Sequence, residues 1–220
     1  MSITADQNTL TQTLKEGAAA LGLALGERQL ARLMAYQALM IKWNKVYNLT
    51  ALRDPAQMVT HHLLDSLAAV GAFAGARRVL DVGAGGGLPG IVLAIWAADA
   101  EPQMQISLVD TVQKKTAFLT QVKAELQLGN VSVFHARVEQ LPTEQQYDVI
   151  TSRAFAELND FIDWSNHLLQ QGGKYIALKG VMPQQEIDRL PPGWKVEKVQ
   201  PLHVPGLDAE RHLIFIERAS

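Results

Sequence analysis

The sequence predicts a doubly wound α/β protein, with a mostly parallel seven-stranded sheet, helices on both faces and a helical N-terminal extension. Three observations predict this fold. Strand signals are nearly absent before residue 76, whereas short β-rich runs alternate with helical stretches from Arg77 onward. An apolar strand also runs through a glycine turn directly into a helix. We therefore expect an extension over residues 1–75, packed on a core over residues 76–220 as one compact unit.

The extension has the spacing of amphipathic helices. Leu30, Leu33, Met34 and Ile41 recur at about 3.6 residues, which indicates one face of a helix. Asp54 followed by Pro55 is a helix start signal, and the helix that it opens is expected to reach Val70.

The core alternates strands and helices. Strands are expected at Arg78–Val82, Gln105–Asp110, Asn130–His135, Tyr147–Thr151, Lys174–Lys179, Trp194–Pro201 and His212–Glu217, and helices at Pro89–Ala98, Val112–Leu128, Leu158–Gln170 and Pro183–Leu190. Only Pro201, Pro205 and Gly206 punctuate the segment between the last two strands, so these strands should form an antiparallel hairpin at a sheet edge.

Composition excludes several kinds of chemistry. The sequence has no cysteine, so it has no disulfide, no thiolate nucleophile and no cysteine-bound metal, and we expect no metal site of another kind. No apolar stretch approaches the roughly 18 residues that cross a bilayer, and the polar N-terminus lacks a signal core, so a cytoplasmic protein is expected.

The formal charge of −2 argues against binding nucleic acid through bulk positive charge. RNA binding would have to depend on a local cationic patch. The cationic residues in or beside predicted loops and helix ends either form such a patch or are ordinary solvated charges. The candidates are Lys42, Lys45, Arg53, Arg77, Arg78, Lys114, Lys115, Arg211 and His212.

The glycine turn predicts a nucleotide-like ligand at the carboxyl ends of the strands, because glycines allow backbone to approach a ligand closely. Gly85, Gly87 and Gly90 satisfy the dinucleotide pattern G-x-G-x-x-G. The spacing of Asp81, Gly83, Gly85 and Gly87, however, looks like the first motif of class I methyltransferases. An acid at Asp81 suits the cationic sulfonium and amino group of S-adenosyl-L-methionine, whereas it suits a pyrophosphate badly. Asp110 is placed to accept hydrogen bonds from ribose hydroxyls with either ligand.

Two other strand ends carry candidates. The segment from Ala136 to Glu139 can hold an adenine edge through a backbone amide and a carboxylate, or it is a solvated turn. Arg153, which follows the fourth strand, can hold the cofactor carboxylate or an RNA phosphate, or it forms a structural ion pair.

With these residues assembled, the sequence closely resembles the bacterial 16S ribosomal RNA guanine-N7 methyltransferase family, also named glucose-inhibited division protein B. The resemblance covers nearly the whole chain. It runs through Lys42–Thr50, Arg53–Pro55, His62–Ser66, the loop Asp81–Gly90, Ser152–Phe155, Ala177–Gly180 and Val204–Leu213. The first and last of these blocks are the most specific, because the fold does not require them.

The resemblance implies S-adenosyl-L-methionine as cofactor, 16S ribosomal RNA in the small ribosomal subunit as partner, and methyl transfer to guanine N7. It places cofactor contacts on Gly83, Leu88, Val138, Glu139 and Arg153, to which the loop and the fold add Asp81, Gly85, Gly87 and Asp110. Guanine N7 carries a lone pair and no proton, so no general base is needed and we name no catalytic residue. Arg153 and Lys179 are the candidates for positioning the substrate.

Further readings stay open. Trp43 and Tyr47 either stack on an unpaired base or pack within a helix, and His61 and His62 are site residues or partly buried structure. Two functions other than methyl transfer also stay open. A nicotinamide-dependent oxidoreductase would use a pair such as Tyr175 and Lys179. An RNA-binding module would bind RNA without turnover. A monomer is expected.

Overall fold

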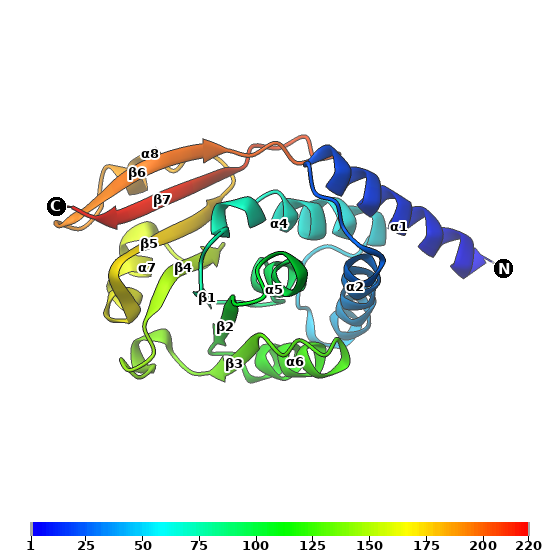
Figure 1. Ribbon diagram of the computed structural model, residues 1–220, viewed down its shortest axis with the longest axis horizontal. Coiled ribbons are helices and arrows are strands. Elements are labelled where there is room, and N and C mark those ends of the chain that lie inside the picture. The colour runs from blue at the N-terminus through cyan, green and yellow to red at the C-terminus, as the bar shows by residue number, and fades with distance from the viewer. Residues whose placement is uncertain (1, 220) are drawn as a thin grey trace.

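The computed structural model describes residues 2–219, and the side chains of residues 7–219. Its centre is one seven-stranded sheet with strand order β3-β2-β1-β4-β5-β7-β6 (Figure 1). Strands β1 to β5 pair in parallel, whereas β7 is antiparallel to both β5 and β6. The strands are β1 (Arg78–Val82), β2 (Gln105–Asp110), β3 (Val131–His135), β4 (Tyr147–Arg153), β5 (Leu169–Lys179), β6 (Trp194–Pro201) and β7 (His212–Arg218).

Helices cover both faces of the sheet. The long ones are α1 (Ser2–Ala20), α2 (Glu27–Tyr47), α5 (Gly90–Ala100), α6 (Gln113–Glu125) and α7 (Leu158–Ser165). The short ones are α3 (Pro55–Met58), α4 (Asp65–Leu67) and α8 (Gln184–Ile187), with a π-helical turn at Val59–Leu64 and 3-10 turns at Val70–Phe73, Val138–Gln140 and Asn166–Leu168. Figure 1 shows α2, α5 and α6 on one side of the sheet and α7 on the other.

Alternating side chains divide the interior into two hydrophobic clusters. On β1, Val79 belongs to the cluster that contains α5 and α6, whereas Leu80 belongs to the cluster that contains α7. This alternation is the period of two expected for a strand that is buried on both faces.

The N-terminal helices share the larger cluster with the sheet. Leu14 of α1, and Leu33 and Tyr36 of α2, are buried together with Ile91 of α5 and Phe118 of α6. The Tyr36 hydroxyl also donates a hydrogen bond to the carbonyl oxygen of Gly86 in the glycine loop. The extension therefore contacts the loop for which the sequence predicts a ligand.

The structure confirms the predicted α/β fold and the antiparallel edge hairpin of β6 and β7. The helix predicted over Leu158–Gln170 was wrong in its second half. Helix α7 ends at Ser165, and β5 already begins at Leu169, because Leu169 pairs with Tyr147 of β4. Helices α6 and α8 are shorter at both ends than the helices predicted over Val112–Leu128 and Pro183–Leu190.

The predicted helix after Asp54 is present, but it is not a regular α-helix. The Asp54 side chain accepts a hydrogen bond from the backbone N–H of Ala56, as an N-cap does. The turn Val59–Leu64 is π-helical, and wide turns of this kind often occur at functional sites.

We predict that Tyr36→Phe lowers the free energy of unfolding by about 1 kcal/mol, because the partly buried Gly86 carbonyl loses its hydroxyl partner. Urea unfolding of the two proteins measures the difference. Tyr47→Phe is the control, because Tyr47 lies on the same helix and is 40% exposed. Equal stability of Tyr36→Phe and the control would contradict the structural role of this contact.

Candidate functional site

The candidate site lies where β1, β2, β4 and β5 end. Strand order reverses between β1 and β4, and this switch point is where open α/β sheets bind ligands. Two cavities open there. We call them the Arg153 cavity, of about 480 Å³, and the Asp110 cavity, of about 430 Å³.

The glycine loop between β1 and α5 separates the cavities from the core. Gly83, Gly85 and Gly87 have φ values of 67°, 56° and 91°, a region that side chains other than glycine rarely adopt. A Cβ at Gly83 would lie 2.2 Å from the ring of Phe155, and one at Gly87 would lie 2.5 Å from Ile91. The loop therefore requires glycine both for its conformation and for its packing.

Asp81 lies beneath this loop and is fully buried. Its Oδ2 accepts a hydrogen bond of 2.9 Å from the backbone N–H of Gly90, at the start of α5. Within residues 2–219, no hydrogen-bond partner reaches its Oδ1. Burial raises the pKa of Asp81 from 3.8 to about 7, against the lowering effect of the Gly90 hydrogen bond.

The Arg153 cavity collects residues from the extension and from the core. Its lining residues are Met40, Leu49, Thr50, His62, Asp65, Gly83, Ala84, Gly85, Gly86, Leu88, Lys115, Arg153, Ala154, Leu178, Lys179, Gly180, Leu202, Arg211 and His212. Four of these side chains are cationic and one is a carboxylate, so the cavity attracts anions.

The Asp110 cavity lies over the ends of β1, β2 and β3. It is lined by Val82, Gly83, Val109, Asp110, Thr111, Val112, Lys115, Ala136, Arg137, Val138, Glu139, Ala154, Phe155 and Trp164. Gly83, Lys115 and Ala154 line both cavities, so the two spaces meet at the loop. Asp110 accepts hydrogen bonds from the backbone N–H groups of Gly85 and Val112, at 2.9 and 2.8 Å.

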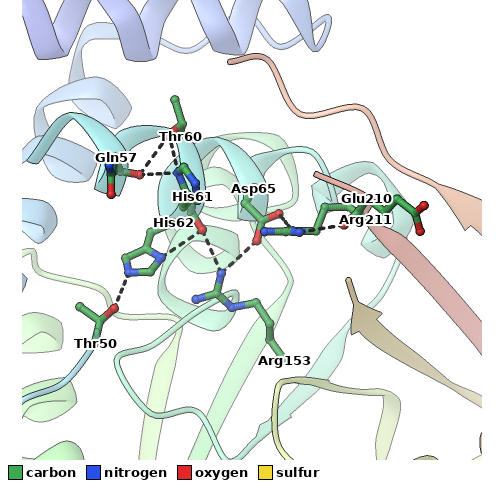
Figure 2. A network of polar contacts seen from close by, with 9 residues as sticks. All are labelled: Thr50, Gln57, Thr60, His61, His62, Asp65, Arg153, Glu210 and Arg211. Carbon is green, nitrogen blue, oxygen red and sulfur yellow. Dashed lines mark hydrogen bonds and ion pairs between the residues drawn. The ribbon is translucent and has the colours of Figure 1, made fainter. Parts of the chain in front are cut away.

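A buried carboxylate joins two arginines in the Arg153 cavity (Figure 2). Asp65 Oδ2 lies 3.0 Å from Arg153 Nη1, and Asp65 Oδ1 lies 2.7 Å from Arg211 Nε. The Asp65 side chain is 4% exposed, against 22% for Arg153 and 25% for Arg211. Arg153 Nη1 also donates to the carbonyl oxygen of His61, at 3.2 Å.

His62 is held in one orientation beside these arginines. Its Nδ1 lies 3.0 Å from the His61 carbonyl oxygen, and its Nε2 lies 2.9 Å from Thr50 Oγ1. Burial, reinforced by the charge of Arg153, lowers the pKa of His62 to about 4. A neutral ring that donates from Nδ1 and accepts from the Thr50 hydroxyl agrees with both observations.

The block Lys42–Thr50 owes its place in the site to Asn44, which is buried. Asn44 Oδ1 accepts from the Thr50 N–H, and its Nδ2 donates to the Leu52 carbonyl oxygen, both at 2.9 Å. The Arg53 guanidinium donates to the Asn44 carbonyl oxygen and to Asn48 Oδ1. These bonds fix the loop that brings Leu49 and Thr50 to the cavity.

Most of the predicted site residues come together. Gly83, Gly85, Leu88, Arg153 and Lys179 line the Arg153 cavity, and Asp110, Val138 and Glu139 line the Asp110 cavity with Gly83. Asp81 and Gly87 line neither cavity, since both lie on the core side of the loop. Lys179 forms an ion pair with Glu186 at 2.7 Å and donates to the Ala156 carbonyl oxygen.

Several alternatives from the sequence are decided by packing. Trp43 packs against Phe118 and donates to Gln121, so it is a packing residue. Tyr175 is buried in the cluster that contains α7 and lines neither cavity, so it forms no catalytic pair with Lys179. Arg77 and Arg78 lie at the opposite end of β1 from the cavities.

Sequence reasoning missed Asp65, Phe155 and Trp164 as site residues. Asp65 stands within the quoted block His62–Ser66, and a single acid among apolar helical residues was its only signal. Trp164 comes from α7 and lies edge-to-face with Phe155 at 5.7 Å, where it lines the Asp110 cavity. No local pattern relates α7 to this cavity.

A sheet of this order, with a glycine loop at its switch point and two cavities that meet over it, defines a class I methyltransferase. The model of one family, described as GidB, rRNA small subunit methyltransferase G, matches residues 29–214. The chain belongs to this family. The resemblance found in the sequence is thereby confirmed, together with the class of S-adenosylmethionine-dependent methyltransferases.

Relatives match over nearly their whole length. The ribosomal RNA small subunit methyltransferase G of Herminiimonas arsenicoxydans is 70% identical over 213 residues, which covers 97% of this chain and 98% of the relative. The protein of the same name from Janthinobacterium sp. (strain Marseille) is 67% identical and is covered to 97%, as is this chain.

A solved structure shares the fold. It is a SAM-dependent methyltransferase from Geobacter sulfurreducens in complex with S-adenosyl-L-homocysteine, with a TM-score of 0.51 and 14% identity. The match covers 83% of this chain and 98% of that chain.

None of the helices described is both long and apolar enough to cross a membrane. Among the side chains that the structure describes, those of residues 7–219, no three from His, Asp or Glu gather as a metal site requires.

The pKa of Asp81 predicts a dependence of stability on pH. An acid whose pKa is higher in the folded state than in the unfolded state contributes less stability as the pH rises between the two values. The contribution of Asp81 to the stability of the wild-type protein should therefore fall as the pH rises from 3.8 to about 7. Asp81→Asn removes this titration.

We predict that the free energy of unfolding of Asp81→Asn, relative to wild type, rises by roughly 1–4 kcal/mol between pH 4.5 and pH 7.5. Urea unfolding at several pH values measures it. Asp148→Asn is the control, because that carboxylate accepts backbone hydrogen bonds from Arg77 and Arg78 at the other end of β1. Parallel pH profiles for wild type and Asp81→Asn would refute the prediction.

Proposed function

We propose that this chain transfers a methyl group from S-adenosyl-L-methionine to N7 of a guanine in 16S ribosomal RNA of the small ribosomal subunit. The observation that carries the proposal is the pair of cavities that meet at Gly83, in a chain whose family is described as rRNA small subunit methyltransferases. One cavity suits a nucleoside, and the other, which is cationic, suits the RNA.

The residues present fit the cofactor. Asp110 is a carboxylate at the end of β2, where it can accept hydrogen bonds from ribose hydroxyls, and Val138 and Glu139 supply an apolar surface and an acid for the adenine. Gly83 and Gly85 present a backbone without Cβ atoms to the ligand. Arg153 and Leu88 lie on the side where the amino acid end of the cofactor would extend.

Asp81 and Gly87 support the cofactor in a different way. Both lie behind the loop, so we propose that they set its conformation rather than contact the ligand. Asp81 Oδ2 has a partner in the Gly90 N–H, whereas no hydrogen bond to the loop explains the buried Oδ1.

Bound S-adenosyl-L-methionine supplies a methyl group activated by its sulfonium. Because guanine N7 has a lone pair and carries no proton to be removed, the residues of this chain would orient the guanine toward that methyl group rather than act as a base. The cationic side chains of the Arg153 cavity, with Arg153 and Lys179 as the leading candidates, hold the RNA phosphate or the guanine edge. His62 stays neutral in this role.

The target guanine has to be reached from its major-groove edge, which proteins read poorly in an A-form helix. We therefore propose that it is unpaired or lies in a partly open subunit. We further propose that residues 1–75 and 76–220 act as one compact unit, and that a cytoplasmic monomer suffices, because a single chain lines both cavities. Light scattering during gel filtration tests the monomer.

The test is transfer of labelled methyl to purified small subunits that lack the modification, followed by identification of the labelled nucleoside. We expect 7-methylguanosine, and we expect Asp110→Asn to weaken cofactor binding about tenfold, because a charge-assisted hydrogen bond to the ribose is lost. Gln140→Glu, which changes charge on a residue outside both cavities, is the control. Cofactor binding without transfer to subunits or free ribosomal RNA would overturn the substrate and favour a binding module.

A further inference from the structure

The bridge between Asp65, Arg153 and Arg211 joins three distant parts of the chain. Asp65 opens α4, Arg153 ends β4, and Arg211 precedes β7, at sequence separations of 88 and 146 residues. Figure 2 shows the two guanidiniums on either side of the Asp65 carboxylate. All three residues line the Arg153 cavity. A contact that closes between segments so far apart fixes the two guanidiniums relative to each other.

The bridge leaves part of each guanidinium for a ligand. Arg153 uses Nη1 for Asp65 and for the His61 carbonyl, and Arg211 uses Nε for Asp65 and Nη1 for the Glu210 carbonyl. Among the described side chains, those of residues 7–219, and the backbone of residues 2–219, neither Arg153 Nη2 nor Arg211 Nη2 has a hydrogen-bond partner. One carboxylate shared by two guanidiniums also leaves a net charge of +1 at the bridge.

The π-helical turn contributes to this arrangement. In a regular α-helix the His61 carbonyl would accept from the Asp65 N–H, but that N–H donates to the carbonyls of His62 and Thr60. The His61 carbonyl is thereby available to Arg153, and the Asp65 side chain beside it takes the same Nη1. One turn of backbone therefore orients Arg153 through two acceptors.

Stability alone does not explain the bridge, because buried ion pairs contribute little net free energy compared with apolar packing. We propose that Asp65 is a positioning residue that aligns Arg153 and Arg211 so that both bind one oxyanion of the reaction. The oxyanion is the carboxylate of the cofactor or a phosphate beside the target guanosine. This inference rests on the proposed function and deepens it.

Positioning and charge predict opposite effects of Asp65→Asn. Removing a negative charge from a cationic cavity strengthens anion binding if only charge matters. Loss of alignment weakens anion binding, because each arginine then has to be ordered by the ligand. The direction of the change therefore tests the role of Asp65.

Three dissociation constants of Asp65→Asn are measured: for S-adenosyl-L-homocysteine, for 5′-methylthioadenosine, which lacks the carboxylate, and for small subunits. If the oxyanion is the cofactor carboxylate, S-adenosyl-L-homocysteine binds about tenfold more weakly and methylthioadenosine is unchanged. If the oxyanion is a phosphate of the RNA, Asp65→Asn binds small subunits about tenfold more weakly. In either case kcat at saturation changes less than twofold and KM carries the effect.

Asp148→Asn is the matched control, because it makes the same change at the end of the sheet far from the cavities. Affinities equal to wild type or tighter for all three ligands overturn the proposal, including the case in which only the melting temperature falls. If Asp65 acts through Arg211, Asp65→Asn made in the Arg211→Gln protein should change the logarithm of the affinity by at most half as much as it does in the wild-type protein.

Arg211→Lys keeps the inference testable if Asp65→Asn fails to fold. Lysine retains the charge but lacks the Nε that Asp65 holds, so alignment predicts nearly the full loss seen in Arg211→Gln. Arg211→Lys protein that binds these ligands with wild-type affinity would overturn the proposal. Wild-type protein that binds S-adenosyl-L-homocysteine and subunits without forming 7-methylguanosine overturns the proposed function instead, and the three affinities still decide the role of Asp65.

Discussion

The turn from β1 into α5 is the constraint on which the rest of the site depends. The backbone N–H of Gly90 donates to Asp81 Oδ2, and a Cβ at Gly90 would lie 2.3 Å from Leu108. The helix consequently starts pressed against the strands, and the chain between them has to bend sharply. Three glycines with positive φ make that bend possible, and the outer side of the loop becomes the wall where both cavities meet.

The same loop gives the N-terminal extension a part in the site. A Cβ added at Gly86 would lie 3.6 Å from Met40 Cε, and the Tyr36 hydroxyl donates a hydrogen bond to the Gly86 carbonyl oxygen. The extension then continues past the loop, and Thr50, His62 and Asp65 complete the Arg153 cavity. The helical extension thus contributes part of the lining of the Arg153 cavity.

Sequence reasoning succeeded where a residue's role depends on local structure. Glycine spacing, strand ends and the Asp54 cap are local, and they located the sheet, the loop and most of the residues that line the cavities. It failed where the role depends on long-range contacts. Asp65 bonds to Arg153 and Arg211, which are 88 and 146 residues away in the sequence, and Trp164 reaches the Asp110 cavity from α7. Pairing of Leu169 with Tyr147 excludes the second half of the helix predicted over Leu158–Gln170. Asp81 is predicted from its motif to serve the ligand, and long-range packing buries it under the loop, which the motif alone does not indicate.

The distribution of charge explains why an acidic chain can serve an RNA substrate. The formal charge is −2, yet four cationic side chains and one carboxylate gather in the Arg153 cavity. Their attraction for phosphate is local, because screening limits it to about 8 Å at physiological salt. The cationic side chains are those of Lys115, Arg153, Lys179 and Arg211, none of which belongs to the glycine loop. The family blocks Lys42–Thr50 and His62–Ser66 add Leu49, Thr50, His62 and Asp65 to the same lining. The buried carboxylate of Asp65 fixes how two of these cations, Arg153 and Arg211, lie relative to each other, so the placement of positive charge in this cavity depends on a residue that is itself anionic.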